Sequence, residues 1–507
     1  MKILLAGPGT GKTTNIKDII TKHGDGSKFL VLSFTNATVN DLQVSLKELG
    51  IAEDNCMTLH KFAVKYNHDY SRHVLHYLEE EELKTIAKGT GIEFNKLCDF
   101  LVCTTFDQMI GRFVDYAKAN PLYLADKLRD YDSLIVDEYQ DFNPNEQALI
   151  DILIEKINTA YVLGDDDQCI YDFKDASSDK IISFFRDVNN EKIAHKHICY
   201  RCPDDVVDHA SNLIRENKKR IDKQWLKNGN PGGIKYLQLR TFDEVADAIY
   251  NEVKRLPNED VLILSPVEFA VDPIARKFAD NHLDYANYFS DKVSVELVAK
   301  AWEVKALYGR YKYLNLVLLG YLRLKNRKKL YELLKLHFDG GADYNSLFKL
   351  LERKMPDNMK NDGVDLEVFL AGEYYRDIKS LYDSAKGKTP EEKLENMFRI
   401  IDKEEEKNIK IMSIHKSKGL GADYVFIVGL IEGILPNKQR GNDSIESQRR
   451  RFYVGMTRAK KQLYLYSNFH VEGKHVNKVN KNDFKYVYKS RMYEGKASTF
   501  ITELKLK

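Results

Sequence analysis

The segment AGPGTGKT, at residues 6–13, restricts the fold of this chain more than any other stretch. It follows the apolar run KILL and precedes a segment with helical spacing that ends at a glycine. Apart from alanine at the first glycine position, it matches the phosphate-loop pattern. In that pattern Gly7, Gly9 and Gly11 let backbone N–H groups approach an anion at a helix N-terminus. The segment therefore predicts a strand, a phosphate-binding loop and a helix in direct succession.

A second, acidic motif indicates a nucleotide site. The segment LIVDEYQDFNPNE places Asp137 and Glu138 directly after an apolar run of strand length. In this position one carboxylate is expected to hold Mg²⁺ and the other to activate a water molecule. Lys12 would reach the β- and γ-phosphates, and the Thr13 hydroxyl would be a further Mg²⁺ ligand. We predict that the phosphates are bound by Ala6, Gly7, Pro8, Gly9, Thr10, Gly11, Lys12, Thr13 and Thr14.

Further apolar runs of strand length occur in two groups. KFLVLSF, SLIVDE, AYVLGD and DVLILSP lie between residues 28 and 266, and NIKIMSIH, DYVFIVGL and KQLYLYS lie between residues 408 and 467. Runs of the first group are followed by helix-like segments such as NEQALIDILIEKI, which is typical of a parallel sheet flanked by helices. We therefore predict an α/β fold with strand signals in both halves of the chain.

Two stretches, at about residues 64–130 and 294–407, interrupt this alternation with helical periodicity. We interpret both as helical insertions into α/β domains; peripheral helices of the same cores are the alternative. A chain of 507 residues is long enough for two or more domains.

Composition limits the partners and the location. The 78 Lys and Arg nearly balance the 76 Asp and Glu, so any basic track for nucleic acid must be local. No leader-like segment or membrane-spanning apolar run is recognisable, and the six cysteines lack a disulfide-scaffold spacing. We expect a cytoplasmic protein without a membrane partner. Cys199 and Cys202 form a Cys-x-x-Cys without a second ligand pair, so we expect neither a metal nor a redox site there.

Several segments resemble the motifs of one helicase family. DEYQD and VLGDDDQCIYDF are similar to motifs of the UvrD/Rep/PcrA group of superfamily 1A DNA helicases. LSFTNATVNDL, TLHKFA, CYRCP, MSIHKSKGL and RRFYVGMTRAK resemble further motifs of the group in the family's order, so the resemblance covers residues 6–460. It implies a compact member with two RecA-like parallel-sheet motor domains and two mainly helical accessory insertions. The implied division is 1–63 with 131–195, 64–130, 196–293 with 408–507, and a reduced insertion at 294–407.

The resemblance implies ATP and Mg²⁺ as ligands and gives single residues their roles. Glu138 would polarise the attacking water, Asp137 would hold Mg²⁺ with Thr13, and Gln168 would sense the γ-phosphate. Arg201 and Arg458 would be arginine fingers that reach the phosphates from the second motor domain. The implied catalytic set is Lys12, Asp137, Glu138, Gln168, Arg201 and Arg458.

The resemblance also implies contacts to single-stranded DNA, whose bases would stack on aromatic rings. The matching aromatic positions are Phe34, Tyr171 and Phe173, the last where the family usually has tryptophan. Lys174 stands where the family has arginine, which weakens the bidentate contact to phosphate. The implied phosphate or sugar contacts are Thr35, Asn36, Thr58, His60, Lys174, His415 and Lys418.

Two departures from the family pattern concern the nucleoside. Relatives carry a glutamine-containing segment before the phosphate loop, and five residues before Ala6 leave no room for it. Gly421 occupies the place of a glutamate that commonly contacts the sugar. The remaining candidate for holding the base is Tyr200, whose ring could stack on adenine without reading its edge. We therefore expect relaxed discrimination between ATP and other purine triphosphates, or dATP.

The resemblance implies an ATP-dependent translocase or helicase acting on single-stranded DNA and 3′-tailed duplexes, with 3′-to-5′ direction, in repair, replication or recombination. Unwinding is less firmly implied than translocation, because the second insertion is short for the family. The alternative is an ATP-gated DNA-sensing subunit that regulates a separate nuclease, as in antiviral defence modules. RNA remains open as a substrate. The intact Lys12, Asp137, Glu138, Arg201 and Arg458 disfavour a third reading, an inactive ATPase kept as a scaffold.

Overall fold

The computed structural model describes residues 1–66, 72–75, 77–192, 197–289, 328, 331–341, 346, 407–438, 444–477, 479, 481–488 and 492–506. These residues belong to two compact units. Unit 1 consists of Met1–Tyr66, Val114–Phe289 and Lys407–Lys507, and unit 2 of Asn67–Phe113 and Ser290–Glu406.

The first sheet of unit 1 has six parallel strands in the order β3-β2-β6-β7-β1-β8. The strands are β1 (Lys2–Leu5), β2 (Phe29–Ser33), β3 (Cys56–Thr58), β6 (Ser133–Val136), β7 (Thr159–Gly164) and β8 (Glu191–Lys192). Every residue of β2 and β6 is buried, as expected for central strands covered on both faces. The phosphate loop follows β1, the acidic motif follows β6 and the segment DDDQ follows β7, so all three lie at the carboxyl edge of this sheet.

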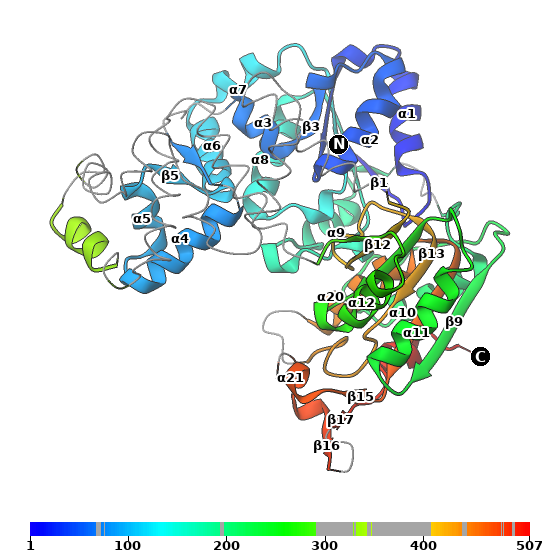
Figure 1. Ribbon diagram of the computed structural model, residues 1–507. Helices are drawn as coiled ribbons and strands as arrows, with labels where there is room; N and C mark the ends of the chain where they lie inside the picture. Colours follow the sequence, from blue (N-terminus) through cyan, green and yellow to red (C-terminus); the bar gives the residue numbers. More distant parts are fainter. Residues whose placement is uncertain are drawn as a thin grey trace, which may run out of the picture. The chain divides into compact units, whose positions relative to one another are not determined.

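Helices α1 (Lys12–His23) and α2 (Asn36–Leu46) pack side by side on one face of the first sheet (Figure 1). Their apolar residues, such as Ile16, Ile20 and Leu42, form a buried cluster with strand residues, such as Leu4 and Ile135. Other helices of this part are α3 (Leu59–Tyr66), α7 (Pro121–Leu128), α8 (Pro144–Lys156) and α9 (Asp179–Arg186). This packing fixes α1 and therefore the loop that precedes it.

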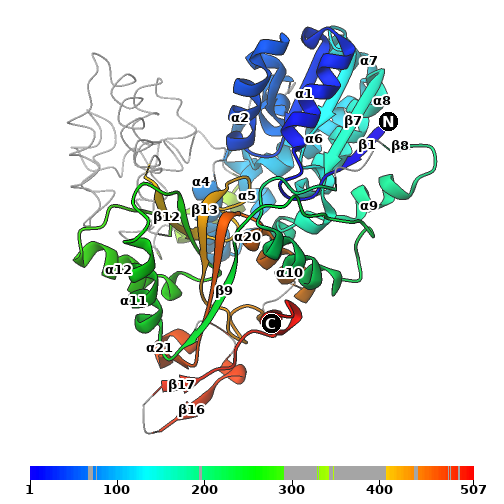
Figure 2. The ribbon, with the colours of Figure 1, turned by 90° about the vertical axis from the view of Figure 1, so that its right-hand side faces the viewer.

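The second sheet of unit 1 is also six-stranded and parallel, in the order β11-β12-β10-β13-β14-β9. Its strands are β9 (Gly233–Leu239), β10 (Val261–Ser265), β11 (Ala286–Asn287), β12 (Ile409–Ser413), β13 (Ala422–Ile427) and β14 (Ala459–Asn468). Helices α10 (Asp204–Arg215), α20 (Ile445–Met456) and α22 (Thr499–Glu503) pack on one face. Helices α11 (Phe242–Val253) and α12 (Asp272–Asp280) cover the other face (Figure 2).

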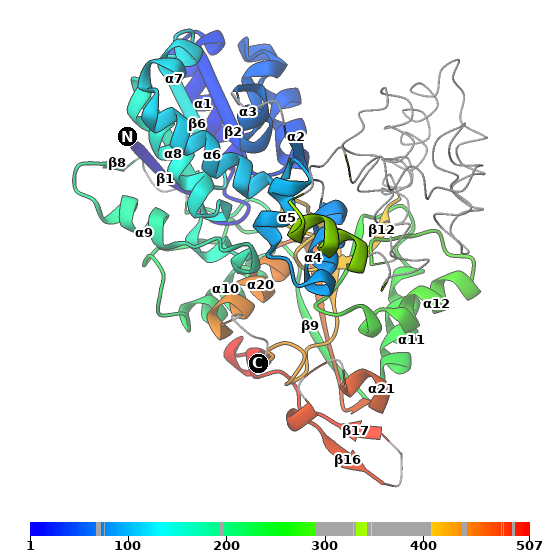
Figure 3. The same ribbon diagram turned by 90° about the vertical axis from the view of Figure 1, so that its left-hand side faces the viewer.

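A small antiparallel sheet follows β14, with β15 (His470–Val471), β17 (Met492–Glu494) and β16 (Lys485–Val487) in this order (Figure 1). Figure 3 shows β16 and β17 side by side. The short helix α21 (Gly473–Val476) lies between β15 and β16 in the chain. The two six-stranded parallel sheets with helices on their faces confirm the predicted α/β fold with two RecA-like domains.

Unit 2 is described over most of its first segment. It contains β4 (His73–Val74) paired in parallel with β5 (Cys103–Thr104), helices α4 (Tyr77–Thr90) and α5 (Phe94–Phe100), and the first part of α6 (Phe106–Ala119). Leu83, Leu97 and Leu334 share one buried cluster, so residues from both predicted insertions contribute to a common core. The predicted limits 64–130 of the first insertion are wider than 67–113, the part that lies in unit 2. Most of the predicted insertion at 294–407 lies outside the described residues, and the four-part division stays a prediction.

Within the described part of the chain, none of the helices combines the length and the apolar character that crossing a membrane requires.

Candidate active site

The phosphate loop has the backbone geometry that its glycines predict. Gly9 and Gly11 adopt left-handed conformations, with φ of 70° and 82°, and Gly11 is the N-cap residue of α1. The Thr10 hydroxyl donates a hydrogen bond of 2.8 Å to the Gly7 carbonyl, and the Asn15 side chain donates one of 2.8 Å to the Gly11 carbonyl. Both bonds stabilise the loop, which lines a cavity of about 900 Å³. This geometry presents backbone N–H groups to a polyphosphate at the N-terminus of a helix of twelve residues.

Two carboxylates at the end of β6 line the same cavity. Glu138 forms an ion pair with Lys12 and accepts a 2.6 Å hydrogen bond from the Gln140 amide. Burial by itself would raise the pKa of Glu138, but the ammonium groups of Lys12 and Lys418 outweigh it and lower the pKa to about 2. Glu138 is therefore ionised at neutral pH, as a general base must be.

Asp137 differs from its neighbour in ways that fit a metal ligand. It is 4% exposed, and its Oδ1 atom has no hydrogen-bond partner among the described residues. Burial raises the pKa of Asp137 to about 6, and the Glu138 carboxylate adds to the shift. A buried carboxylate oxygen without a partner is costly unless a ligand satisfies it. Thr13 lines the same cavity, so a hydroxyl and a carboxylate oxygen are available for Mg²⁺.

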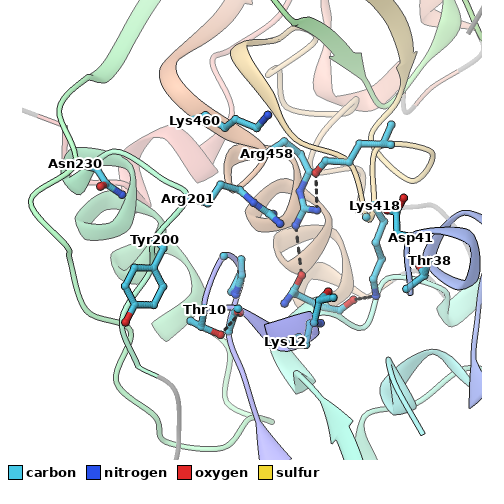
Figure 4. A pocket seen from close by; sticks show the side chains of 18 of the residues that line it. Thr10, Lys12, Thr38, Asp41, Tyr200, Arg201, Asn230, Lys418, Arg458 and Lys460 are labelled. Atoms are coloured by element: carbon cyan, nitrogen blue, oxygen red, sulfur yellow. Dashed lines mark hydrogen bonds between the residues drawn. The ribbon is translucent and has the colours of Figure 1, made fainter. Parts of the chain in front are cut away.

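The opposite wall of the cavity carries two arginines from elements of the second sheet (Figure 4). Arg458 follows α20 and is 2% exposed. It donates hydrogen bonds to the carbonyls of Val454 at 2.9 Å and Leu420 at 3.1 Å, and to Gln168 Oε1 at 3.4 Å. Burial, together with repulsion from Arg201, lowers the pKa of Arg458 to about 9. Two cations held this close together are stabilised when an anion enters the cavity.

The loop that carries Arg201 lies directly against the phosphate loop. The Tyr200 N–H donates a 2.9 Å hydrogen bond to the Gly9 carbonyl. A Cβ atom at Gly9 would lie 2.6 Å from Cβ of Arg201, so only glycine fits at this position. The Trp225 indole N–H donates a 3.0 Å hydrogen bond to the Pro8 carbonyl. The Tyr200 side chain lines the cavity and is 60% exposed, which leaves its ring accessible to a base.

Aromatic rings and a lysine from loops of both sheets lie close together beside this cavity. We call Phe34, Tyr171, Lys174 and His415 the ring cluster. The rings of Phe34 and Tyr171 lie 5.1 Å apart, and those of Tyr171 and His415 lie 6.5 Å apart. The Lys174 ammonium lies 5.9 Å from the ring centres of both Phe34 and Tyr171. Phe34 follows β2 and Tyr171 follows the segment after β7, whereas His415 follows β12. The structure thus brings together four of the residues that the sequence assigned to single-stranded DNA.

The comparisons with known proteins agree with this geometry. Residues 343–469 match the family model of the UvrD-like helicase C-terminal domain, and residues 1–174 match that of an AAA domain. ATP-dependent DNA helicase PcrA of Leuconostoc citreum is 23% identical over 436 residues, covering 72% of this chain and 58% of its own length. ATP-dependent DNA helicase Rep of Buchnera aphidicola is 27% identical over 400 residues, covering 65% of this chain and 62% of its own length. The chain is therefore similar in sequence to the PcrA and Rep helicases over about two thirds of its length or more.

The share of a relative's own length that the alignment covers differs among the relatives. This chain spans about 60% of the length of the PcrA and Rep proteins above. A probable DNA helicase II homolog of Rickettsia conorii is 23% identical over 588 residues, covering 91% of this chain and 89% of its own length.

Lys418, one of the predicted DNA contacts, lies at the wall of the cavity. Its ammonium group lies 2.7 Å from Asp141 Oδ1, donates a 2.6 Å hydrogen bond to the Gln168 carbonyl and lies 4.0 Å from Glu138. Its side chain is 6% exposed and lines the nucleotide cavity. The carboxylate of Asp141 thus holds this ammonium group away from solvent, and contact of Lys418 with DNA stays a prediction.

Three other predicted DNA contacts are engaged in local structure. Thr35 is the N-cap of α2 and accepts a 3.1 Å hydrogen bond from the Thr38 N–H, and Thr58 accepts one of 3.1 Å from the Lys61 N–H. His60 lies 3.1 Å from Glu146, the residue that completes the capping box of α8. The side chains of Asn36 and Phe173 lie outside the described part of the structure. For all of these residues, contact with DNA stays a prediction.

Sequence reasoning missed several residues of the cavity wall. They come from α2, from the loop after Trp225, from β13 and from the residues after Arg458, and are Thr38, Asp41, Asn230, Asp423, Lys460 and Lys461. Lys460 directly follows the motif GMTRA, so its position beside a finger arginine was a usable signal. Lys461 follows Lys460, and Asp423 lies two residues after Gly421, so both were also near a motif. Asn230 is distant in sequence from every motif.

The Cys-x-x-Cys pair is buried next to the fingers. The Cys202 N–H donates a 3.3 Å hydrogen bond to Cys199 Sγ, and both cysteines are free thiols. Among the described residues, the one group with metal-ligand geometry is Asp165, Asp166 and Asp167, which includes no cysteine.

Proposed function

We propose that this chain hydrolyses ATP to move along single-stranded DNA in the 3′-to-5′ direction. The observation that carries the proposal is a single cavity with the phosphate loop on one side and Arg201 and Arg458 on the other (Figure 4). The relatives named above are called ATP-dependent DNA helicases, which supports ATP as the nucleotide and DNA as the partner. The direction rests on the family resemblance alone.

The residues of the cavity have different roles in ATP hydrolysis. Lys12 and the N–H groups of the loop bind the β- and γ-phosphates. Glu138, which is ionised, accepts a proton from the attacking water. Arg458 and Arg201 stabilise the charge that develops on the transferred phosphoryl group. Thr13 and Asp137 would hold Mg²⁺, which neutralises phosphate charge when it is bound.

Hydrolysis can be converted into movement because the cavity is shared. ATP draws the finger arginines toward the phosphate loop, and loss of the γ-phosphate removes that attraction. Gln168 hydrogen-bonds Arg458, and Tyr171 of the ring cluster follows three residues later. Each cycle of opening and closing would therefore change the grip of Phe34, Tyr171 and Lys174 on the bases. Stacking on these rings does not require a particular sequence.

A strand-displacement assay tests the motor and its direction. Three duplexes are compared with ATP present: one with a 3′ single-stranded tail, one with a 5′ tail and one with blunt ends. We expect displacement of the 3′-tailed duplex. Preference for the 5′ tail would overturn the direction. ATP hydrolysis without displacement or movement, combined with a co-purifying nuclease, would support the alternative of a DNA-sensing regulatory subunit.

Nucleotide choice is expected to be relaxed. A Cβ atom at Gly421 would lie 3.4 Å from Lys460 Cε and 3.7 Å from Arg201 Nε, so a cationic surface occupies the place of the family's carboxylate. Tyr200 offers a ring face but no edge-specific hydrogen bond through that face. We predict values of kcat/KM for GTP and dATP within about tenfold of that for ATP. A hydrolysis panel of the three nucleotides checks this, and a strict preference for ATP would contradict it.

The substitution Gly9→Ala tests the contact between the two loops. Its positive φ of 70° costs alanine roughly 1–2 kcal/mol, and its Cβ would overlap Arg201. Gly24→Ala is the matched control, because Gly24 has φ of 81° with nothing within 4 Å of its Cβ position. Both variants should lose stability through their positive φ, Gly9→Ala more because of the overlap with Arg201, but only Gly9→Ala should lose ATP hydrolysis. Equal hydrolysis by the two variants would show that the contact is dispensable.

A further inference from the structure

A buried cluster of charges lies directly behind the phosphate cavity. Asp165, Asp166 and Asp167 follow β7, and their side chains are at most 1% exposed. Their carboxylate oxygens come close enough together to hold a metal ion. Three buried carboxylates repel one another strongly unless a cation lies among them.

A lysine from the second half of unit 1 supplies that cation. The Lys223 ammonium lies 2.8 Å from Asp165 Oδ1 and 2.8 Å from Asp167 Oδ2, and also contacts Asp166. Its side chain is 8% exposed. Arg220 adds a bidentate contact to Asp167, at 2.9 and 2.7 Å. Lys223 therefore occupies the place that a metal ion would take, and the cluster is complete without one.

The cluster is connected to the reaction site through one side chain. Asp165 Oδ2 accepts a 2.8 Å hydrogen bond from the Gln168 amide, while its Oδ1 atom faces Lys223. The other end of the Gln168 amide, Oε1, accepts the 3.4 Å hydrogen bond from Arg458. Asp165 Oδ1 also accepts a 3.2 Å hydrogen bond from the Asp167 N–H. Lys223 and this N–H together fix the rotamer of Asp165, and Asp165 fixes which end of the Gln168 amide faces the finger arginine. The backbone carbonyl of Gln168 is held separately, by Lys418.

The segment that carries Lys223 also contacts the phosphate loop. Two residues later, Trp225 donates its hydrogen bond to the Pro8 carbonyl. The carbonyl of the next residue, Leu226, accepts a 2.8 Å hydrogen bond from the Cys199 N–H. Cys199 lies two residues before Arg201. Residues 220–226 therefore contact the loop of Gln168, the phosphate loop and the loop leading to a finger arginine. A shift of residues 220–226 would therefore displace all three loops.

We propose that Lys223 is a positioning residue for ATP hydrolysis, acting through Asp165 and Gln168 on Arg458. The inference rests on the proposed function, because it concerns the same cavity. The Lys223 ammonium group is held among three carboxylates, and Lys223 is absent from the cavity wall, so it does not contact the nucleotide itself. Its loss should therefore change kcat rather than the binding of ATP.

The test compares Lys223→Met with Lys227→Met in the full chain. Lys227 directly follows this segment and forms an exposed ion pair with Asp208, so its substitution should leave hydrolysis unchanged. We expect Lys223→Met to lower the DNA-stimulated kcat by about tenfold or more with KM for ATP within about twofold, because small misplacements of catalytic groups are costly. An unchanged kcat would overturn the inference. If the unaltered chain lacked DNA-stimulated hydrolysis, the proposed function would fail instead.

Two double variants separate positioning from structural support. Lys223→Met in a Gln168→Ala background should cost almost no further kcat, because the side chain it acts through is already missing. A full further loss would show that Lys223 acts elsewhere. Lys223→Met with Asp166→Asn restores the balance of charges without restoring the contact to Asp165. We expect this pair to regain thermal stability but not kcat; recovery of both would reduce Lys223 to a structural role.

Discussion

Substitution of Glu138 by glutamine is expected to abolish turnover while preserving ATP binding. The amide keeps the shape of the side chain but cannot accept the proton of the attacking water. The unaltered carboxylate is ionised, since Lys12 and Lys418 lower its pKa to about 2 against the effect of burial. Removing a general base of this kind costs roughly a hundred- to ten-thousandfold in kcat. Steady-state hydrolysis and equilibrium binding of a fluorescent ATP analogue measure the two effects.

The control for this variant is Glu155→Gln, on the exposed side of α8. It removes one negative charge from the same domain and should hydrolyse ATP at the normal rate. A Glu138→Gln variant that hydrolyses as fast as this control would show that another group activates the water.

Substitution of Arg458 by lysine should have the second-largest effect. The guanidinium is held by two backbone carbonyls and by Gln168 Oε1, a geometry that a single ammonium group cannot reproduce. An arginine finger acts on charge that develops in the transition state, so we expect kcat to fall on the order of a thousandfold. KM for ATP should change much less, because ground-state binding depends mainly on the phosphate loop.

Arg255→Lys provides the comparison for Arg458→Lys, since Arg255 is 69% exposed on the other side of the second sheet. Its kinetics should match those of the unaltered chain. If Arg458→Lys raised KM and left kcat intact, Arg458 would have to be regarded as a binding residue rather than a finger.

The parts of the site that could be predicted from the sequence are those built from neighbouring residues. The strand, the glycine loop and α1 follow one another within residues 2–23, so local periodicity and glycine positions determine them. The same holds for Asp137 and Glu138, which directly follow a buried strand. The sheets themselves were predictable because their strands are continuous apolar runs separated by helical segments.

The parts that could not be predicted depend on partners distant in sequence. Lys418 reaches Asp141, which is 277 residues away, and no local pattern distinguishes a buried lysine from one on a DNA-binding surface. The family resemblance implied a contact with DNA, and the structure adds contacts with Asp141 and Glu138 at the cavity, which no local pattern indicates. The role of Lys223 was hidden for the same reason, because it is defined only by the three aspartates that surround it.

The ring cluster shows the intermediate case. The resemblance named Phe34, Tyr171, Lys174 and His415 as separate positions, and spacing alone could not show that they meet. In the structure, each ring centre or ammonium group of the cluster lies within 6.5 Å of a neighbouring ring centre. The four residues come from loops that follow strands of both sheets. Stacking by this cluster is what would let nucleic acid influence Gln168 and the fingers.

The central claim is that this cavity hydrolyses ATP under the control of single-stranded DNA. The most direct measurement is the rate of ATP hydrolysis by the full chain with and without an unstructured single-stranded oligonucleotide. We expect a low basal rate that rises severalfold with DNA, and a loss of this rise when Phe34 and Tyr171 are both replaced by alanine. The same rate with and without DNA would contradict this claim.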